Sequence, residues 1–169
     1  MRCLSVRQPW ASLLVTGGKR LETRSWRTRH RGPLAIHAAQ QFPGPVRALC
    51  GQEPFRSALL RAGIHDPADL PRGKVVGYGE LVGCVATQQL VAAGFAGERA
   101  EERCFGDYRP GRWAWALVHP IALAVPQDYR GQRGLFEVPD TFFLASGGCK
   151  PPDLFTAQGV YTPRSPHPR

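Results

Sequence analysis

The stretch GGKRLETRSW, residues 17–26, joins a glycine turn, a lysine and an alternating strand. Alternation predicts that Glu22, Arg24 and Trp26 project from the same side of that strand. Lysine is rare in this chain: it supplies three of the 22 lysines and arginines, and Lys19 stands in this turn. A hairpin that only reverses the chain needs none of these side chains, so the segment predicts a functional site.

Short elements are expected on both sides of this stretch. Upstream, Cys3 to Arg7 predicts a strand, and a helix follows from Pro9 to the glycines at 17 and 18. Downstream, after a loop over residues 27–32, a second strand is expected to turn Leu34, Ile36 and Ala38 toward the core and His37 the other way.

The rest of the chain predicts more short elements around a sheet. Residues 44–63 have helical spacing interrupted by Pro54, and Val75 to Ala86 is the longest strand pattern, with Val76, Tyr78, Glu80, Val82 and Cys84 on one face and glycines at 77, 79 and 83 opposite. Those glycines predict a bulge, tight curvature or close backbone approach, as in a small barrel.

Beyond residue 86 the patterns are weaker. Residues 87–112 predict a helix and a polar loop in which Glu98, Glu101 and Glu102 form a solvated face. Two strands follow, at 113–117 and 121–125, separated by His119 and Pro120, and residues 135–138 are expected to close the sheet. The interpretation is an α+β, mainly β, domain over residues 1–146, followed by an extended or disordered tail over 147–169.

Composition is consistent with one soluble domain. The 169 residues are 43% hydrophobic and contain 19 glycines and 16 prolines, which favours β or α+β structure over a helical bundle. Without a membrane-length apolar run or a signal-peptide pattern, we expect a cytoplasmic protein, a monomer with no membrane partner. The five cysteines are scattered, so we expect reduced thiols; neither metal-ligand spacing nor a nucleotide fingerprint predicts a metal or cofactor.

The charge is strongly positive. A net charge of +9 and a pI of about 10.0 suit a polyanionic partner, although codon usage in a genome rich in G and C would also inflate arginine. Clustering favours the first explanation, because Arg27, Arg29 and Arg31 follow Trp26 closely. Arginines interleaved with an aromatic ring are typical of surfaces that bind phosphates and bases.

Three residues are candidates for catalysis. A desolvated lysine can lose its proton, so Lys19 could take a proton from water or a hydroxyl, with Glu22 or Glu80 as acid or tuning group. Structural explanations stay open: Glu22 could pair with Arg24 to lock the sheet, Glu80 and Lys19 could face solvent, and His37 could be a packed histidine. An isolated tryptophan in a small domain is most often a core residue.

Three ordered motifs give a resemblance. Leu4-Ser-Val-Arg-Gln-Pro-Trp10, then Gly17-x-Lys19-x-x-Glu22-x-Arg24, then Gly32-Pro-Leu-Ala-Ile-His37-Ala, resemble the ASCH domain family over about residues 2–140. The resemblance implies a small β-barrel like that of PUA domains, with flanking helices and the signature residues in a cleft. It also implies RNA recognition, or chemistry on nucleic acids and modified nucleosides.

The leading functional hypothesis is an RNA-binding or modified-nucleoside-binding protein, with DNA as a possible partner. Arg7, Arg24 and the loop arginines would contact phosphate, Trp26 would stack on a base, and Glu22 would accept a hydrogen bond from a base amino group. Gln8, Trp10 and His37 are further candidates for ligand contact.

The alternative is a metal-independent hydrolase of single-stranded RNA or of an acylated nucleoside such as N4-acetylcytidine, using Lys19, Glu22 and Glu80. A family branch with that deacetylase activity has a threonine nucleophile three residues after the lysine. Glu22 stands there in this chain, so the covalent mechanism does not carry over. An adaptor for another protein is the third class.

Overall fold

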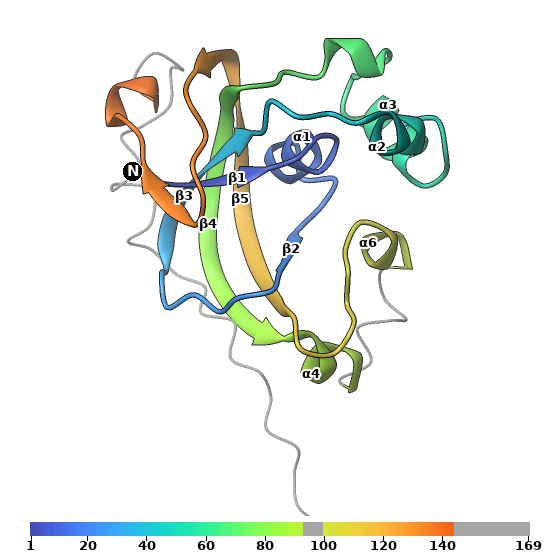
Figure 1. Cartoon of the computed structure of the whole chain (residues 1–169), viewed down its shortest axis with the longest axis vertical. Coiled ribbons are helices and arrows are strands. Elements are labelled where there is room, and N and C mark those ends of the chain that lie inside the picture. Colours follow the sequence, from blue (N-terminus) through green and yellow to red (C-terminus); the bar gives the residue numbers. More distant parts are fainter. Residues whose placement is uncertain (93–99, 144–169) are drawn as a thin grey trace, which may run out of the picture.

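The computed structural model describes residues 1–92 and 100–143, which contain one six-stranded sheet. Its strands are β1 (Arg2–Val6), β2 (Leu21–Arg24), β3 (Gly32–Ala38), β4 (Lys74–Ala86), β5 (Trp113–Asp128) and β6 (Leu135–Glu137). They lie in the order β2-β5-β4-β3-β1-β6; β1 pairs with β3 in parallel and the other neighbours pair antiparallel. The sheet curls strongly along β4 and β5 (Figure 1), which confirms the predicted mainly β, barrel-like fold.

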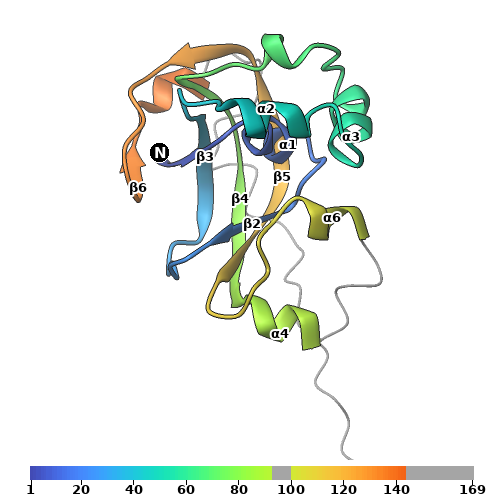
Figure 2. The same cartoon turned by 45° about the vertical axis from the view of Figure 1, so that its right-hand side comes forward.

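Short helices surround the curled sheet. They are α1 (Trp10–Val15), α2 (Gly44–Leu49), α3 (Phe55–Arg61), α4 (Thr87–Ala92) and α6 (Ala100–Cys104), with 3-10 turns at Pro67–Asp69 and Asp140–Phe143. Helix α1 packs inside the curl, while α2, α3 and α6 lie on its open side (Figure 2). The helical region predicted over 44–63 is two helices: α2 ends at Leu49, and Pro54 stands just before α3, where a missing backbone N–H is tolerated.

Strand β3 is buried on both faces. Leu34, Ile36 and Ala38 pack with α1 in one apolar cluster, and Ala35 packs with Phe136 in another. The alternation predicted for this strand is therefore confirmed. Because apolar side chains on both faces of β3 are removed from water, an almost unbroken apolar run stabilises this strand.

The alternation predicted for β4 is wrong. Its register against β5 shifts at three places, so Val76 and Cys84 join the α1 cluster whereas Tyr78 lies in the other cluster. Each bulge inserts a residue and reverses which face the following side chains occupy. The close approach predicted from the glycines is confirmed at Gly77, where a Cβ would overlap the Ile121 carbonyl oxygen and lie 2.8 Å from Val15 Cβ.

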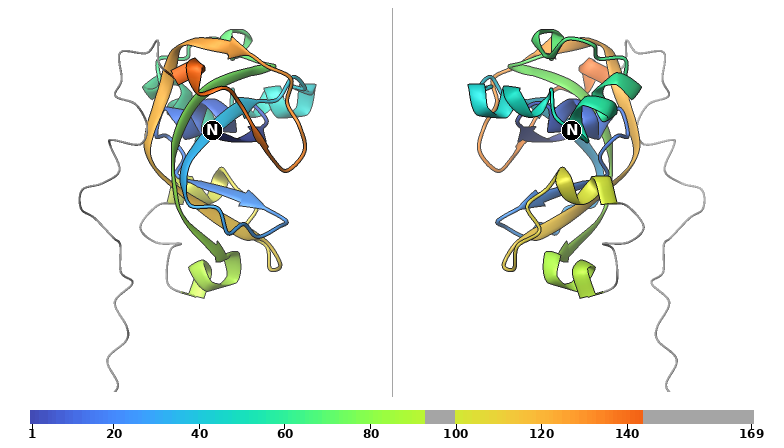
Figure 3. Two further views of the ribbon diagram at one scale, coloured as in Figure 1. Left: turned by 90° about the vertical axis from the view of Figure 1, so that its left-hand side faces the viewer. Right: turned by 90° about the vertical axis from the view of Figure 1, so that its right-hand side faces the viewer.

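Two strands were predicted where the structure has one. Strand β5 runs from Trp113 to Asp128 through His119 and Pro120, and His119 adopts a φ of 48°. The local distortion bends the strand without ending it, so β5 follows the curve of β4 around the sheet (Figure 3). Strand β6 pairs with β1, which confirms the predicted closing strand.

The start of the chain contacts the last described residues, and two predictions lie outside the described ranges. Val138 and Asp140 both accept hydrogen bonds from the Met1 ammonium, at 2.9 and 2.6 Å, so the 3-10 turn is tied to the start of the chain. The predicted tail over 147–169 and Glu98 lie outside the described residues. Within the described residues, we find no helix that combines the length and apolarity of a membrane span.

Candidate functional site

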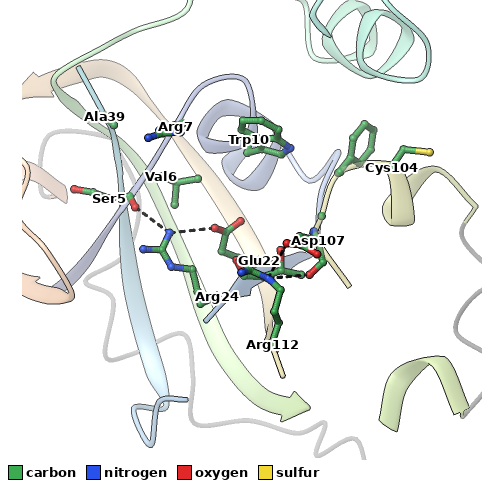
Figure 4. Close-up of a pocket in the computed structure, with 13 residues that line it drawn as sticks. Ser5, Val6, Arg7, Trp10, Glu22, Arg24, Ala39, Cys104, Asp107 and Arg112 are labelled. Carbon is green, nitrogen blue, oxygen red and sulfur yellow. Dashed lines mark hydrogen bonds and ion pairs between the residues drawn. The ribbon is translucent and has the colours of Figure 1, made fainter. Parts of the chain in front are cut away.

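A cavity of about 700 Å³ opens between the first strands, α1 and the segment after α6. Its lining comes from β1 and the turn after it, from β2, and from residues 104–112 (Figure 4). The lining residues are Ser5, Val6, Arg7, Trp10, Glu22, Thr23, Arg24, Ala39, Cys104, Phe105, Gly106, Asp107 and Arg112. We call this space the first cavity.

Glu22 and Arg24 form the polar wall of the first cavity. Strand β2 is an edge strand whose register sets Glu22 opposite Trp115 and Arg24 opposite Trp113. Arg24 Nη1 donates to two acceptors, the Glu22 carboxylate at 3.4 Å and the Ser5 carbonyl at 3.5 Å. Arg24 therefore bridges β2 and β1 across the cavity, as the sticks in Figure 4 show.

Lys19 lies beneath this wall and does not line the cavity. Its side chain is fully buried, and its ammonium donates to the Leu21 carbonyl and, at 3.0 Å, to the Phe105 carbonyl. The ammonium nitrogen is also 3.7 Å from a Glu22 carboxylate oxygen. Burial lowers the pKa of Lys19, and the carboxylates of Glu22 and Glu102 oppose that shift. Lys19 thus anchors Glu22 from the buried side of the wall, and the alternative that Lys19 faces solvent is excluded.

Glu102 is the second carboxylate of this buried cluster, and sequence reasoning missed it. Its oxygens accept hydrogen bonds from the backbone N–H groups of Arg20 and Leu21 at 3.0 Å each, and one of them lies 4.0 Å from the Lys19 ammonium. The predicted solvated face is wrong at this position. Glu101, its neighbour on α6, is exposed and pairs with Arg61 at 2.6 Å.

The part of the lining that follows α6 was not predicted either. Asp107 donates its backbone N–H to the Thr23 hydroxyl at 3.0 Å, and Arg112 donates to the backbone carbonyls of Asp107 and Thr23. Hydrogen bonds from Arg109 lower the pKa of Asp107 to about 2, so its carboxylate is charged at neutral pH. The sequence signal was a polar loop, which does not indicate which element the loop covers.

Four of the predicted site residues line the first cavity: Arg7, Trp10, Glu22 and Arg24. Arg7 is exposed, and Trp10 is half-buried with its ring edge-on to Phe55 at 5.8 Å. Gln8 is fully buried instead, where it bonds to Ser12 and to the Pro71 carbonyl. Its amide fixes the start of α1 and lies outside the cavity lining.

Trp26 is half-buried and packs against the core, and the Arg24 guanidinium lies 6.0 Å from the centroid of its ring. Its ring meets that of Trp115 edge-on at 4.6 Å, and its carbonyl accepts a hydrogen bond from the Trp115 indole N–H at 3.3 Å. Strand β2 ends at Arg24, so the alternation that would have kept Trp26 beside Glu22 stops two residues earlier. The aromatic residues that line the cavity are Trp10 and Phe105.

His37 and Glu80 lie elsewhere as well. His37 is buried on the other side of β1, between the Ser5 hydroxyl and the Tyr129 carbonyl, each at 3.0 Å. Glu80 is partly exposed on β4, 3.5 Å from the imidazole of His119. Neither residue lines the first cavity, so the expected convergence of Lys19, Glu22 and Glu80 on one pocket is not found.

The basic loop continues from Arg24 but stays outside the cavity lining. Arg27, Arg29 and Arg31 are all exposed, and Arg27 lies over the Trp113 ring at 5.3 Å.

In the part of the chain that the structure describes, no group of three or more His, Cys, Asp or Glu side chains is arranged to hold a metal ion.

Comparison with known proteins agrees with this architecture. The ASCH domain matches residues 4–127. Activating signal cointegrator 1 from Homo sapiens is 47% identical over 89 residues, and the Mus musculus protein is 46% identical over the same length. Each match covers 52% of this chain but only 15% of the relative, so the similarity concerns one part of a much longer protein.

A solved structure supports the fold. The crystal structure of ASCH from Zymomonas mobilis superposes with a TM-score of 0.51 over 84% of this chain and 90% of that one, at 14% identity. The domain match spans most of the chain, from β1 nearly to the end of β5. The chain therefore belongs to the ASCH domain family.

Proposed function

We propose that the protein binds RNA or a modified nucleoside, with the base in the first cavity. The observation that carries this proposal is the Glu22 carboxylate, held between the Lys19 ammonium and the Arg24 guanidinium at the wall of a cavity of about 700 Å³. That volume lies within the range of small-molecule sites, roughly 300–1,000 Å³.

Each wall of the first cavity suits a different part of a nucleotide. Glu22 is an acceptor for a base amino group, because a carboxylate has more lone pairs than its two distant cationic partners occupy. Trp10 offers a ring face or edge for stacking, worth about 1–3 kcal/mol per base. Arg7 and Arg112 bring positive charge to the rim, where it would attract phosphate.

Binding is favoured over hydrolysis by the position of Lys19. A general base must reach the proton that it removes, within about 2.6–3.2 Å or through one water. Lys19 is fully buried, and its ammonium donates to the Leu21 and Phe105 carbonyls and pairs with the Glu22 carboxylate. A hydrolase built on this cavity would have to use Glu22 in that role.

The test compares Glu22→Gln with wild-type protein by isothermal titration against cytidine, adenosine, guanosine, uridine and N4-acetylcytidine. Replacing a charged acceptor should remove about 1.5–3 kcal/mol of binding, roughly tenfold or more in Kd. Uridine, which lacks an exocyclic amino group, should bind weakly to both proteins.

Glu101→Gln is the matched control, since it makes the same change on the exposed face of α6. Equal affinities for wild type, Glu22→Gln and Glu101→Gln would contradict the proposal. Mass spectrometry of the same mixtures examines turnover: a hydrolysis product that disappears in Glu22→Gln would favour the hydrolase.

A further inference from the structure

A second cavity, of about 640 Å³, lies on the other side of β1. It is lined by Ser5, His37, Ala39, Gln40, Gln41, Gly73, Tyr129, Arg130, Gly131, Gln132 and Arg133. Ser5 and Ala39 line both cavities, so these two residues form a shared wall. A ligand longer than one nucleoside could pass over that wall from one cavity to the other.

Ser5 turns a different group toward each cavity. Its backbone carbonyl accepts from Arg24 on the side of the first cavity, at 3.5 Å. Its hydroxyl lies 3.0 Å from Nδ1 of His37, which lines the second cavity. Ser5 is half-buried and lines both cavities.

The direction of the hydrogen bonds at Ser5 follows from its partners. The Tyr129 carbonyl can only accept, so Nε2 of His37 carries the hydrogen of the 3.0 Å bond between them. Burial lowers the pKa of His37, which favours the neutral ring, and the Nδ1 of that tautomer accepts. Ser5 therefore donates its hydroxyl hydrogen to His37, and the lone pairs of the Ser5 hydroxyl oxygen can accept a hydrogen bond.

Gly131 packs directly against this position. A Cβ at residue 131 would overlap Cε1 of His37 and lie 2.8 Å from both His37 Nδ1 and Ser5 Oγ. No side chain fits there without displacing its neighbours, whereas glycine lets the backbone approach the Ser5 hydroxyl and the His37 ring closely.

The two cavities differ in charge. The first contains two carboxylates, Glu22 and Asp107, beside its arginines. The second contains Arg130 and Arg133, both exposed, and none of the described residues that line it is acidic. A base edge with donors suits the first cavity, and an anionic phosphate suits the second.

We propose that the two cavities together hold a single RNA strand. The second cavity binds the phosphate adjoining the base in the first, through Arg130 and Arg133, and Ser5 accepts a hydrogen bond from the ribose 2′-hydroxyl between them. This inference rests on the proposed function. It narrows the ligand to a ribonucleotide strand, because a free nucleoside lacks the phosphate and DNA lacks the 2′-hydroxyl.

The experiment measures fluorescence anisotropy with labelled eight-nucleotide RNA and DNA of one sequence built from A, C and G. Wild-type protein should prefer RNA, and Ser5→Ala should weaken RNA binding roughly three- to tenfold, the worth of one neutral hydrogen bond, without changing DNA binding. In the double variant Arg130→Gln/Arg133→Gln, the slope of log K against log salt should become shallower by about 1.4, for two phosphate contacts on a single strand.

Arg47→Gln/Arg56→Gln is the matched control, because it removes the same charge from exposed positions on α2 and α3 that line neither cavity. A second measurement avoids any loss of folding in Ser5→Ala: RNAs with one 2′-deoxy substitution at each position are titrated against wild type. One position should lose affinity with wild type and none with Ser5→Ala.

The outcomes separate this inference from the proposed function. If Glu22→Gln weakens RNA binding while the 2′-deoxy series is flat and both double variants behave alike, the strand proposal is overturned and the proposed function stands. If Glu22→Gln leaves RNA binding unchanged, the proposed function itself fails.

Discussion

Replacing Lys19 with methionine tests the buried cluster on which the first cavity is built. Methionine keeps much of the length of the side chain but removes the charge and all three donors. The Leu21 and Phe105 carbonyls would lose a donor, and the carboxylates of Glu22 and Glu102 would lose their shared cation. The exposed fractions of the three side chains are 0%, 9% and 4% for Lys19, Glu22 and Glu102, so water cannot easily replace it.

The expected loss is large for a domain of this size. Removing one partner of a buried ion pair costs about 3–5 kcal/mol, against total stabilities of about 5–15 kcal/mol. At about 2–4 °C per kcal/mol, the melting temperature should fall by roughly 6–20 °C. Urea denaturation followed by circular dichroism at neutral pH gives the free energy of unfolding directly.

Lys74→Met provides the control. It makes the same substitution on β4, where Lys74 pairs at 2.6 Å with an Asp128 side chain that is 85% exposed. A surface pair of this kind contributes about 0–1 kcal/mol. If Lys19→Met destabilised the protein no more than Lys74→Met, Lys19 would not anchor the cluster, and the account of how Glu22 is positioned would be refuted.

Three further variants test other parts of the structure. Burial lowers the pKa of His37 below its ordinary 6.5, so the unfolded chain binds the extra proton first and the free energy of unfolding should fall as the pH drops from about 7.5 to about 5.5. The urea midpoint should fall less over this range in His37→Gln than in wild type. In the control His65→Gln, which changes an exposed histidine, the midpoint should fall as far as in wild type. Trp26→Ala should lower the free energy of unfolding by about 2–4 kcal/mol, because its ring packs on Trp115, and should leave the affinity for nucleosides unchanged. A loss of affinity measured by calorimetry would show that Trp26 is part of the binding site. Gly131→Ala should force a methyl group against the Ser5 hydroxyl and the His37 ring, and so abolish the preference for RNA over DNA in anisotropy titrations. Gly44→Ala, where a Cβ meets nothing within 4 Å, should keep that preference, and an unchanged preference in Gly131→Ala would place the 2′-hydroxyl elsewhere.

Local patterns in the sequence determined the short elements and four of the residues that line the first cavity. The period of two in β3 gave the correct two faces, because that strand stays in regular register over Leu34 to Ile36. The spacing from Lys19 to Arg24 drew attention to a real cluster. Glu22 and Arg24 are two residues apart on one strand, so alternation alone places them side by side.

The tertiary structure decided everything that depends on distant partners. Glu102 is buried because it caps the backbone of Arg20 and Leu21, 82 and 81 residues away. Ser5 meets His37 because β1 and β3 pair in parallel, 32 residues apart. Bulges in β4 and the end of β2 at Arg24 interrupt the alternation of side chains between the two faces, which the sequence had predicted to continue. A period describes neighbours along one chain segment; burial and hydrogen-bond partners are fixed only when segments far apart in sequence pack together.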